Sequence, residues 1–240
     1  MTVKSSNRDA IAHGKINVEP LREQPKYPSW ALKLTMAVTG VLFGLFVIVH
    51  MLGNLKIFAG EEDFNAYATF LRTVGAPAVP NEGILWIFRI VLHIFGGLTL
   101  AARAKQSRGK FRRQGMVSSW NTFTARSMVI TGIVLLAFII FHLLDLTIGA
   151  GVAPSSFEHG EAYQNVVASF SRPGVVVWYI IAQLALLLHL SHGLWTATSD
   201  LGITGKRWRK VLLFLSGLLP LLVVVGNIFI PVAVLTGLVS

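Results

Sequence analysis

Hydrophobic and polar positions alternate along this chain in long blocks. Five apolar blocks are each long enough to cross a bilayer as a helix, which takes about 20 residues. They cover roughly residues 30–53, 84–104, 127–149, 174–198 and 211–238. Pro220 and Pro231 lie inside the fifth block, where we expect a kink. The pattern predicts an all-α integral membrane protein: residues 1–29 form a polar tail, and residues 30–240 form one bundle of five transmembrane helices.

One connection carries a further amphipathic segment. The sequence "EEDFNAYATFLR", which begins at Glu61, predicts a short helix on the outer surface that caps the bundle. We expect no internal repeat and no low-complexity stretch elsewhere in the chain.

The charged residues indicate how the bundle is oriented. Only 13% of the residues are charged, against about 25% in a soluble domain. Seventeen of the 21 lysines and arginines lie in the tail through Lys33, between residues 103 and 126, and in "GKRWRK". The positive-inside rule then predicts a cytoplasmic N-terminus and an external C-terminus. This rule also explains the net charge of +10, so we expect no nucleic-acid partner.

The lack of cysteine limits the chemistry of the chain. Without cysteine, the chain forms no disulfide and holds no iron–sulfur cluster or zinc-thiolate site by itself. The first 30 residues contain charges but no apolar core, so we expect them not to act as a secretory signal peptide. We expect the first span to direct insertion into the membrane.

Five histidines inside the predicted spans are the candidates for chemistry. Ionisable groups at that depth are costly and usually functional. With a rise of about 1.5 Å per residue, one pair falls near the outer ends of the first and third helices and a second pair falls deeper on the second and fourth. His192 fits the deeper pair less well. The histidines are His50 and His142 in the outer pair, His93 and His189 in the inner pair, and His192.

Two facing imidazole pairs suit two haem b groups, because neutral imidazole is a common axial ligand of haem iron. An iron bound by two histidines has no open position, which favours electron transfer over oxygen chemistry. A di-iron site needs several carboxylates, and only Asp145 lies in or near a span. A zinc site needs three or four ligands at one depth, whereas these pairs lie at two depths.

Other polar residues lie near these histidines. Asp145 shares a helix face with His142, where it serves a hydrogen bond, a proton path or only the membrane interface. Arg89, one turn before His93, pairs with a haem propionate or with Asp145. We expect three aromatic residues to lie in the aromatic belt at the outer membrane interface: Trp86, Trp178 and Tyr179. We expect Asn227 on the fifth helix to form a hydrogen bond to another helix.

Four stretches together resemble a known family. They are "TGVLFGLFVIVHMLGNLKIFAGEEDFNAYATFLR", "FRIVLHIFGGLTLAARAKQSR", "FHLLDLTIG" and "LHLSHGLWTATSDLGIT". The chain resembles the single-chain, five-helix, dihaem cytochrome b membrane anchor of succinate dehydrogenase and fumarate reductase, complex II. The segments "HLLDLT" and "YQNVVASF" look most like the actinobacterial branch.

The resemblance implies a ligand for each of the first four helices. His50 and His142 match the ligands of the outer haem, and His93 and His189 match those of the inner haem. His192 is an extra histidine, and three roles stay open for it: iron ligand, partner of a haem propionate, or quinone contact.

The resemblance also implies the function. Such an anchor is the subunit of succinate dehydrogenase or fumarate reductase that lacks the flavin. It carries electrons between the iron–sulfur subunit and menaquinone or a related quinone, in the inner or plasma membrane. Its expected partners are the flavoprotein and iron–sulfur subunits, quinone and the lipid bilayer, and the complex can form a higher oligomer. Ser29, Trp30 and Lys33 are candidates for one quinone site, and the Glu61–Tyr67 stretch for another.

Two other function classes stay open. The first is the dihaem subunit of another quinone-linked enzyme, such as a formate dehydrogenase or a hydrogenase, or an ascorbate-reducing cytochrome. The second is a transporter with a histidine proton relay, although we see no inverted repeat or pair of broken helices.

Overall fold

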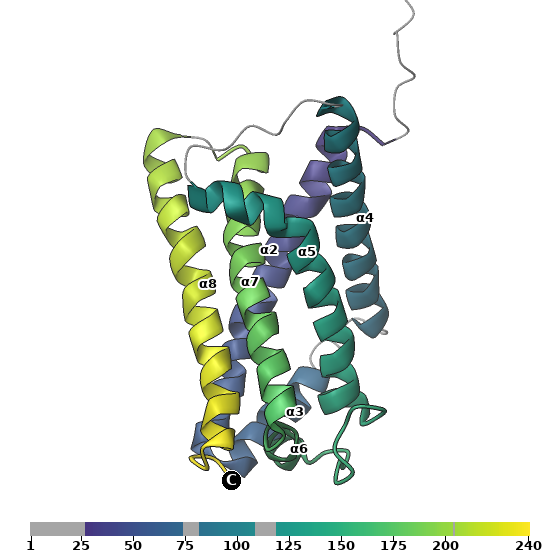
Figure 1. Cartoon of the computed structure of the whole chain (residues 1–240), viewed down its shortest axis with the longest axis vertical. Coiled ribbons are helices and arrows are strands. Elements are labelled where there is room, and N and C mark those ends of the chain that lie inside the picture. The colour runs from purple at the N-terminus through teal and green to yellow at the C-terminus, as the bar shows by residue number, and fades with distance from the viewer. Residues whose placement is uncertain (1–26, 74–81, 109–118, 204) are drawn as a thin grey trace, which may run out of the picture.

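The computed structural model describes residues 27–73, 82–108, 119–203 and 205–240; the side chains of residues 82–86, 108 and 119–121 lie outside the description. Within these residues, the chain is a bundle of long helices without strands (Figure 1). Five helices are long and apolar enough to cross a membrane, which confirms the predicted fold class. They are α2 (Ser29–Asn54), α4 (Glu82–Arg108), α5 (Ser119–Leu143), α7 (Pro173–Asp200) and α8 (Lys206–Leu235).

Short elements cover one end of the bundle. Figure 1 shows α3 and α6 at the same end as the C-terminus. We call this end the capped end, and the opposite end, where α2 and α8 begin, the basic end. α3 confirms the predicted amphipathic helix, whereas α6 was not predicted. The short elements are the 3₁₀-helix η1 (Leu55–Ala59), α3 (Glu61–Thr73), the π-helix η2 (Leu144–Ile148) and α6 (Ala162–Phe170).

Local sequence explains several helix ends. Pro173 begins α7, where its missing N–H costs no hydrogen bond. At the end of α5 the helix widens into η2 and stops at Gly149, whose φ of 72° is left-handed and favours glycine. Pro220 and Pro231 both lie within α8, which continues through them as one helix.

Four of the five long helices stand around a common interior. α2 packs against α4 and α7, and α5 packs against α7, while α4 touches α5 only slightly. Consequently α2 faces α5 across one diagonal of the bundle, and α4 faces α7 across the other. α8 packs on α7 from outside. Large apolar side chains such as Leu45, Ile130 and Phe214 are exposed on the outer surface, as expected for contact with lipid.

A cluster of buried apolar side chains lies at the capped end. There Ile57, Phe64 and Phe170 pack with Tyr179 and the end of α8. Tyr179 is 6% exposed, so its predicted place in an interfacial belt is wrong: Phe170 of α6 and two phenylalanines of α5 cover its ring.

The other polar and aromatic predictions within the spans have separate outcomes. The side-chain amide of Asn227 donates to Gln183 Oε1 at 3.1 Å, which confirms the predicted bond between helices. Trp178 is partly buried. The side chain of Trp86 lies outside the description, as do the tail through residue 26 and the basic residues between 109 and 118.

Candidate functional site

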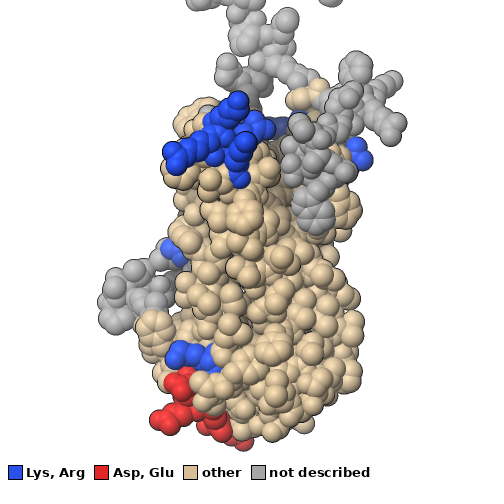
Figure 2. All heavy atoms as spheres, turned by 90° about the vertical axis from the view of Figure 1, so that its left-hand side faces the viewer, with Lys and Arg blue, Asp and Glu red and all other residues tan. Residues whose placement is uncertain are grey.

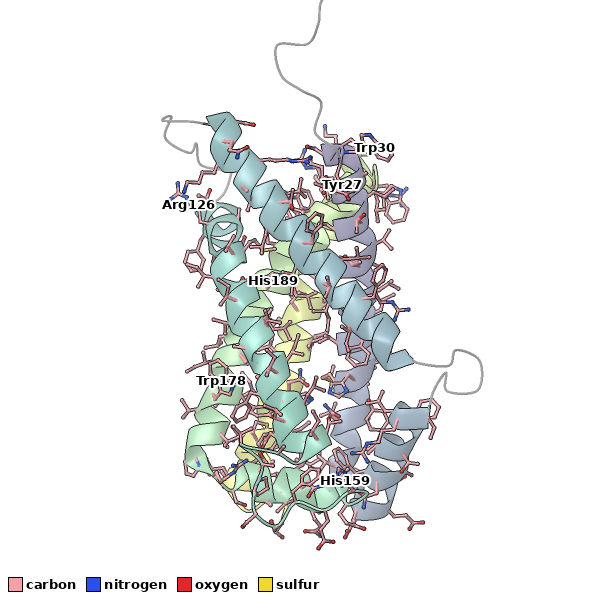
Figure 3. All side chains as sticks on the ribbon, turned by 90° about the vertical axis from the view of Figure 1, so that its right-hand side faces the viewer. Tyr27, Trp30, Arg126, His159, Trp178 and His189 are labelled. Carbon is pink, nitrogen blue, oxygen red and sulfur yellow. The ribbon has the colours of Figure 1, made fainter. Side chains whose placement is uncertain are left out.

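Four histidines meet in two pairs across the diagonals of the bundle. The rings of His50 on α2 and His142 on α5 lie 5.9 Å apart between centres. The rings of His93 on α4 and His189 on α7 lie 6.4 Å apart. In Figure 3, His189 lies between the end that carries Trp30 and the end that carries His159. The structure therefore brings together the same pairs that the sequence suggests. We call them the capped-end pair and the basic-end pair.

The spacing within each pair suits one metal ion between two imidazoles. Metal–nitrogen bonds of about 2 Å on opposite sides of one iron place the ring centres about 6 Å apart. The planes of the rings meet at 84° in the capped-end pair and at 56° in the basic-end pair. The rings are therefore not stacked on each other, and the donor set fits an iron with two axial histidines.

Two threonine hydroxyls orient the basic-end pair. Thr39 Oγ1 lies 2.8 Å from Nδ1 of His93, and Thr131 Oγ1 lies 3.0 Å from Nδ1 of His189. Each hydroxyl donates its single proton to the carbonyl four residues earlier in its own helix, at 2.7 and 3.0 Å. Each oxygen therefore accepts a hydrogen bond from Nδ1–H. This tautomer leaves the lone pair of Nε2 available to a metal.

Each of these threonines is followed by a glycine that lies against the ring. A Cβ at Gly40 would lie 3.5 Å from Cε1 of His93, and a Cβ at Gly132 would lie 3.4 Å from Cε1 of His189. The segments "TGVLFGLFVIVH" in α2 and "TGIVLLAFIIFH" in α5 share threonine, glycine and histidine at identical spacing. In both helices this shared spacing places a hydroxyl at the basic-end pair and an imidazole at the capped-end pair.

The capped-end pair has a different environment. Nδ1 of His142 lies 3.1 Å from the hydroxyl of Tyr179, which donates to Oδ2 of Asp145 at 3.3 Å. Asp145 is fully buried and is bound by Arg172 Nη2 at 2.6 Å and by the Ser169 hydroxyl. The hydrogen bond was one of the roles that the sequence left open for Asp145, whereas its partners Tyr179, Ser169 and Arg172 were not predicted.

Two expectations for Asp145 need correction. It is not an interfacial carboxylate, because α6 and the start of α7 enclose it. Its cationic partner is Arg172 rather than Arg89. Arg89 lies on α4, one turn toward the capped end from His93.

The imidazole of His50 differs from the other three. Its Nδ1 is buried and has no hydrogen-bond partner among the described residues.

His192 belongs to neither pair. It lies one turn beyond His189 toward the basic end, and its Nδ1 lies 3.5 Å from Thr124 Oγ1. The three roles that the sequence leaves open for it stay predictions.

The candidate quinone residues at the basic end lie together at the start of α2. Ser29 Oγ accepts a hydrogen bond from Arg103 at 3.1 Å, and Lys33 forms an ion pair with Asp200 at 3.7 Å. Trp30 is 69% exposed. The structure thus groups these residues at one edge of the bundle, close to the ends of α4 and α7.

The stretch from Glu61 to Tyr67 covers the capped end. The Tyr67 hydroxyl donates to the backbone carbonyl of His50 at 3.4 Å, and its ring packs over Gly53, where even a Cβ would collide with it. Burial raises the pKa of Tyr67 above its ordinary value, so the phenol stays protonated at neutral pH. α3 is therefore fixed against the helix that carries His50.

The two ends of the bundle differ in charge. Figure 2 shows basic side chains gathered where α8 begins and acidic ones at the capped end. The first turns of α8 expose Lys206, Arg207, Arg209 and Lys210, and the Arg209 guanidinium lies 5.4 Å from the centre of the Trp195 ring. α3 begins with three acidic residues.

Comparison with known proteins identifies the family. The sequence is 30% identical over 166 residues to the succinate dehydrogenase cytochrome b558 subunit of Bacillus subtilis (strain 168), and the alignment covers 67% of this chain and 74% of that relative. The chain belongs to the succinate dehydrogenase cytochrome b558 subunit family. With its five apolar helices, this cytochrome b558 family member is a multi-pass membrane protein. No family model matches the sequence.

Proposed function

We propose that this chain is the membrane anchor of a succinate:quinone oxidoreductase and carries electrons between an iron–sulfur subunit and menaquinone or a related quinone through two b haems. The observation that carries the proposal is the presence of two histidine pairs with ring centres 5.9 and 6.4 Å apart. The family supports the partners, since its named relative is a subunit of succinate dehydrogenase.

Each pair has a distinct task in this proposal. His50 and His142 would hold the haem nearer the capped end, and His93 and His189 would hold the haem nearer the basic end. Bound haem would supply one-electron redox chemistry at each pair. Thr39 and Thr131 keep the basic-end imidazoles protonated on Nδ1, which leaves the lone pair of Nε2 available to the iron.

The surrounding helices make the site suitable for a large flat group. α4 touches α5 only slightly, and all four histidines are only partly covered by the chain itself. Gly40 and Gly132 leave no side chain beside the basic-end imidazoles. A macrocycle bound to these imidazoles would complete their burial and keep water from the iron. Arg89, one turn from His93, is placed to pair with a propionate.

We assign the basic end to the cytoplasm, as the positive-inside rule requires. The exposed cations at the start of α8 then face the soluble flavoprotein and iron–sulfur subunits. Ser29, Trp30 and Lys33 contact quinone at the same end, and the Glu61–Tyr67 stretch lines a second quinone position at the capped end.

The proposal is tested by purifying the chain from native membranes with its bound subunits. We expect a b-type reduced-minus-oxidised spectrum, two haems per chain, and haem reduction on addition of succinate. A flavoprotein and an iron–sulfur protein should copurify. A chain free of haem would overturn the proposal, and haem that formate or hydrogen reduces instead would favour a different quinone-linked dehydrogenase.

A further inference from the structure

A chain of hydrogen bonds connects His142 to an arginine near the protein surface. Nδ1 of His142 contacts the Tyr179 hydroxyl at 3.1 Å, and that hydroxyl contacts Asp145 Oδ2 at 3.3 Å. Asp145 Oδ1 binds Arg172, whose side chain is 36% exposed. Arg172 also donates to the carbonyl of Val152 at 2.6 Å. The network therefore ties one candidate haem ligand to the loop and helices of the capped end.

The direction of these hydrogen bonds follows from the groups involved. The carboxylate of Asp145 can only accept, so the Tyr179 hydroxyl donates its proton to it. The phenol oxygen is then an acceptor, and Nδ1 of His142 is the donor. This arrangement keeps the imidazole proton on Nδ1 and leaves the lone pair of Nε2 available to a metal.

We propose that Tyr179 is a positioning residue for His142: backed by the Asp145–Arg172 pair, it fixes the tautomer of this ligand and lowers the reduction potential of the capped-end haem. The inference rests on the proposed function, in which His142 binds iron. A hydrogen bond from a ligand imidazole to an acceptor backed by a carboxylate raises the basicity of the ligand. A more basic ligand stabilises ferric iron over ferrous iron.

The lowering of the reduction potential is confined to the capped-end pair. At the basic-end pair the acceptors are Thr39 and Thr131, and behind each stands a neutral backbone carbonyl instead of a carboxylate. His50 has no partner at Nδ1 among the described residues. Tyr179 therefore distinguishes His142 from the other three imidazoles.

The hydroxyl of Tyr179 can be removed without disturbing its ring. The ring packs edge-on against Phe138 and Phe170, with centres 4.9 and 4.7 Å away, and against Phe141 at 6.2 Å. Phenylalanine at this position would keep these contacts. Tyr179→Phe thus changes the hydrogen bond to His142 while the aromatic packing stays the same.

The test is a spectroscopic redox titration of the intact complex with Tyr179→Phe. We expect both haems to remain. One component should become easier to reduce, with its reduced-to-oxidised ratio at a fixed potential rising roughly tenfold, which for one electron corresponds to about 59 mV. The other component should not move. The matched control is Tyr163→Phe, which removes a hydroxyl that donates to the carbonyl of Ser240 at 3.3 Å and should leave both potentials unchanged.

If Tyr179→Phe loses haem, a second variant tests the effect of this network on the reduction potential. Asp145→Asn combined with Arg172→Gln retains Tyr179 but removes both charges, so that no buried charge is left alone. It should shift the same component in the same direction by a smaller amount. Wild-type potentials in a variant that holds two haems would overturn this inference alone. A wild-type complex without haem would overturn the proposed function, and this inference with it.

Discussion

The hydroxyl of Thr39 on α2 lies 2.8 Å from Nδ1 of His93 on α4, so one helix orients an imidazole that belongs to its neighbour. Thr131 on α5 holds His189 on α7 in the same way at 3.0 Å. Both imidazoles of the basic-end pair are therefore fixed across helix–helix interfaces, and their alignment depends on how the helices pack.

Removal of the Thr39 hydroxyl should weaken haem binding at the basic-end pair. Thr39→Val preserves the shape of the side chain but leaves Nδ1 of His93 without an acceptor. Because loss of such a partner typically costs 10–100-fold in metal affinity, we expect faster haem loss from one site on dilution of the purified complex. Thr39→Ser should restore retention.

Thr236→Val is the control, since among the described residues the Thr236 hydroxyl bonds to carbonyls at the end of α8 and to no histidine. Equal haem retention in Thr39→Val and Thr236→Val would show that the contact with His93 has no role in binding.

The contact between Gly53 and Tyr67 should not tolerate a side chain. A Cβ at Gly53 would collide with the outer end of the Tyr67 ring, so Gly53→Ala must displace this ring from its place over α2. Overpacking of this kind costs about 1–3 kcal/mol. We expect a lower thermal unfolding midpoint of the detergent-solubilised complex. Gly217→Ala, at a helix position with nothing within 4 Å of the added Cβ, should match or exceed the wild type. Equal midpoints for the two variants would contradict the packing.

The ion pair between Arg172 and Asp145 should contribute much more to stability than the ion pair between Lys33 and Asp200. Asp145 is fully buried, so Arg172→Ala would leave its charge unpaired, at a typical cost of about 3–5 kcal/mol. Lys33 is 55% exposed in its pair with Asp200, and Lys33→Ala should cost at most about 1 kcal/mol. Denaturant unfolding of both variants in one detergent measures the difference. Similar losses would mean that Asp145 is not enclosed.

The absence of cysteine makes the orientation of the chain directly measurable. Single cysteines introduced as Glu62→Cys in α3 and Arg207→Cys in α8 would lie at opposite ends of the bundle, and both native side chains are exposed. In intact cells, an impermeant maleimide should label position 62, and it should label position 207 only after the membrane is opened. The reverse pattern would place the basic end outside.

Hydropathy and histidine spacing were sufficient to predict much of this molecule. The five spans follow from apolar length alone, and the rise per residue suggests which imidazoles share a depth. The amphipathic pattern from Glu61 identified α3. α6 was missed because its nine residues are too few for a clear periodic signal.

The partners of the histidines could not be predicted in the same way. A threonine in an apolar helix usually bonds to its own backbone, and only the rotation of neighbouring helices decides whether it also reaches an imidazole. The spacing shared by Thr39 with His50 and by Thr131 with His142 was a visible signal that went unused. Asp145 and Arg172 lie far apart in sequence, and the fold alone joins them.

Haem quantitation on single histidine variants tests the two-pair account most directly. The wild-type chain should hold two haems, and His50→Ala, His93→Ala, His142→Ala and His189→Ala should each lose one haem or the assembled complex. His192→Ala should keep both. Loss of a haem in His192→Ala, together with full haem content in His189→Ala, would contradict the pairing of His93 with His189.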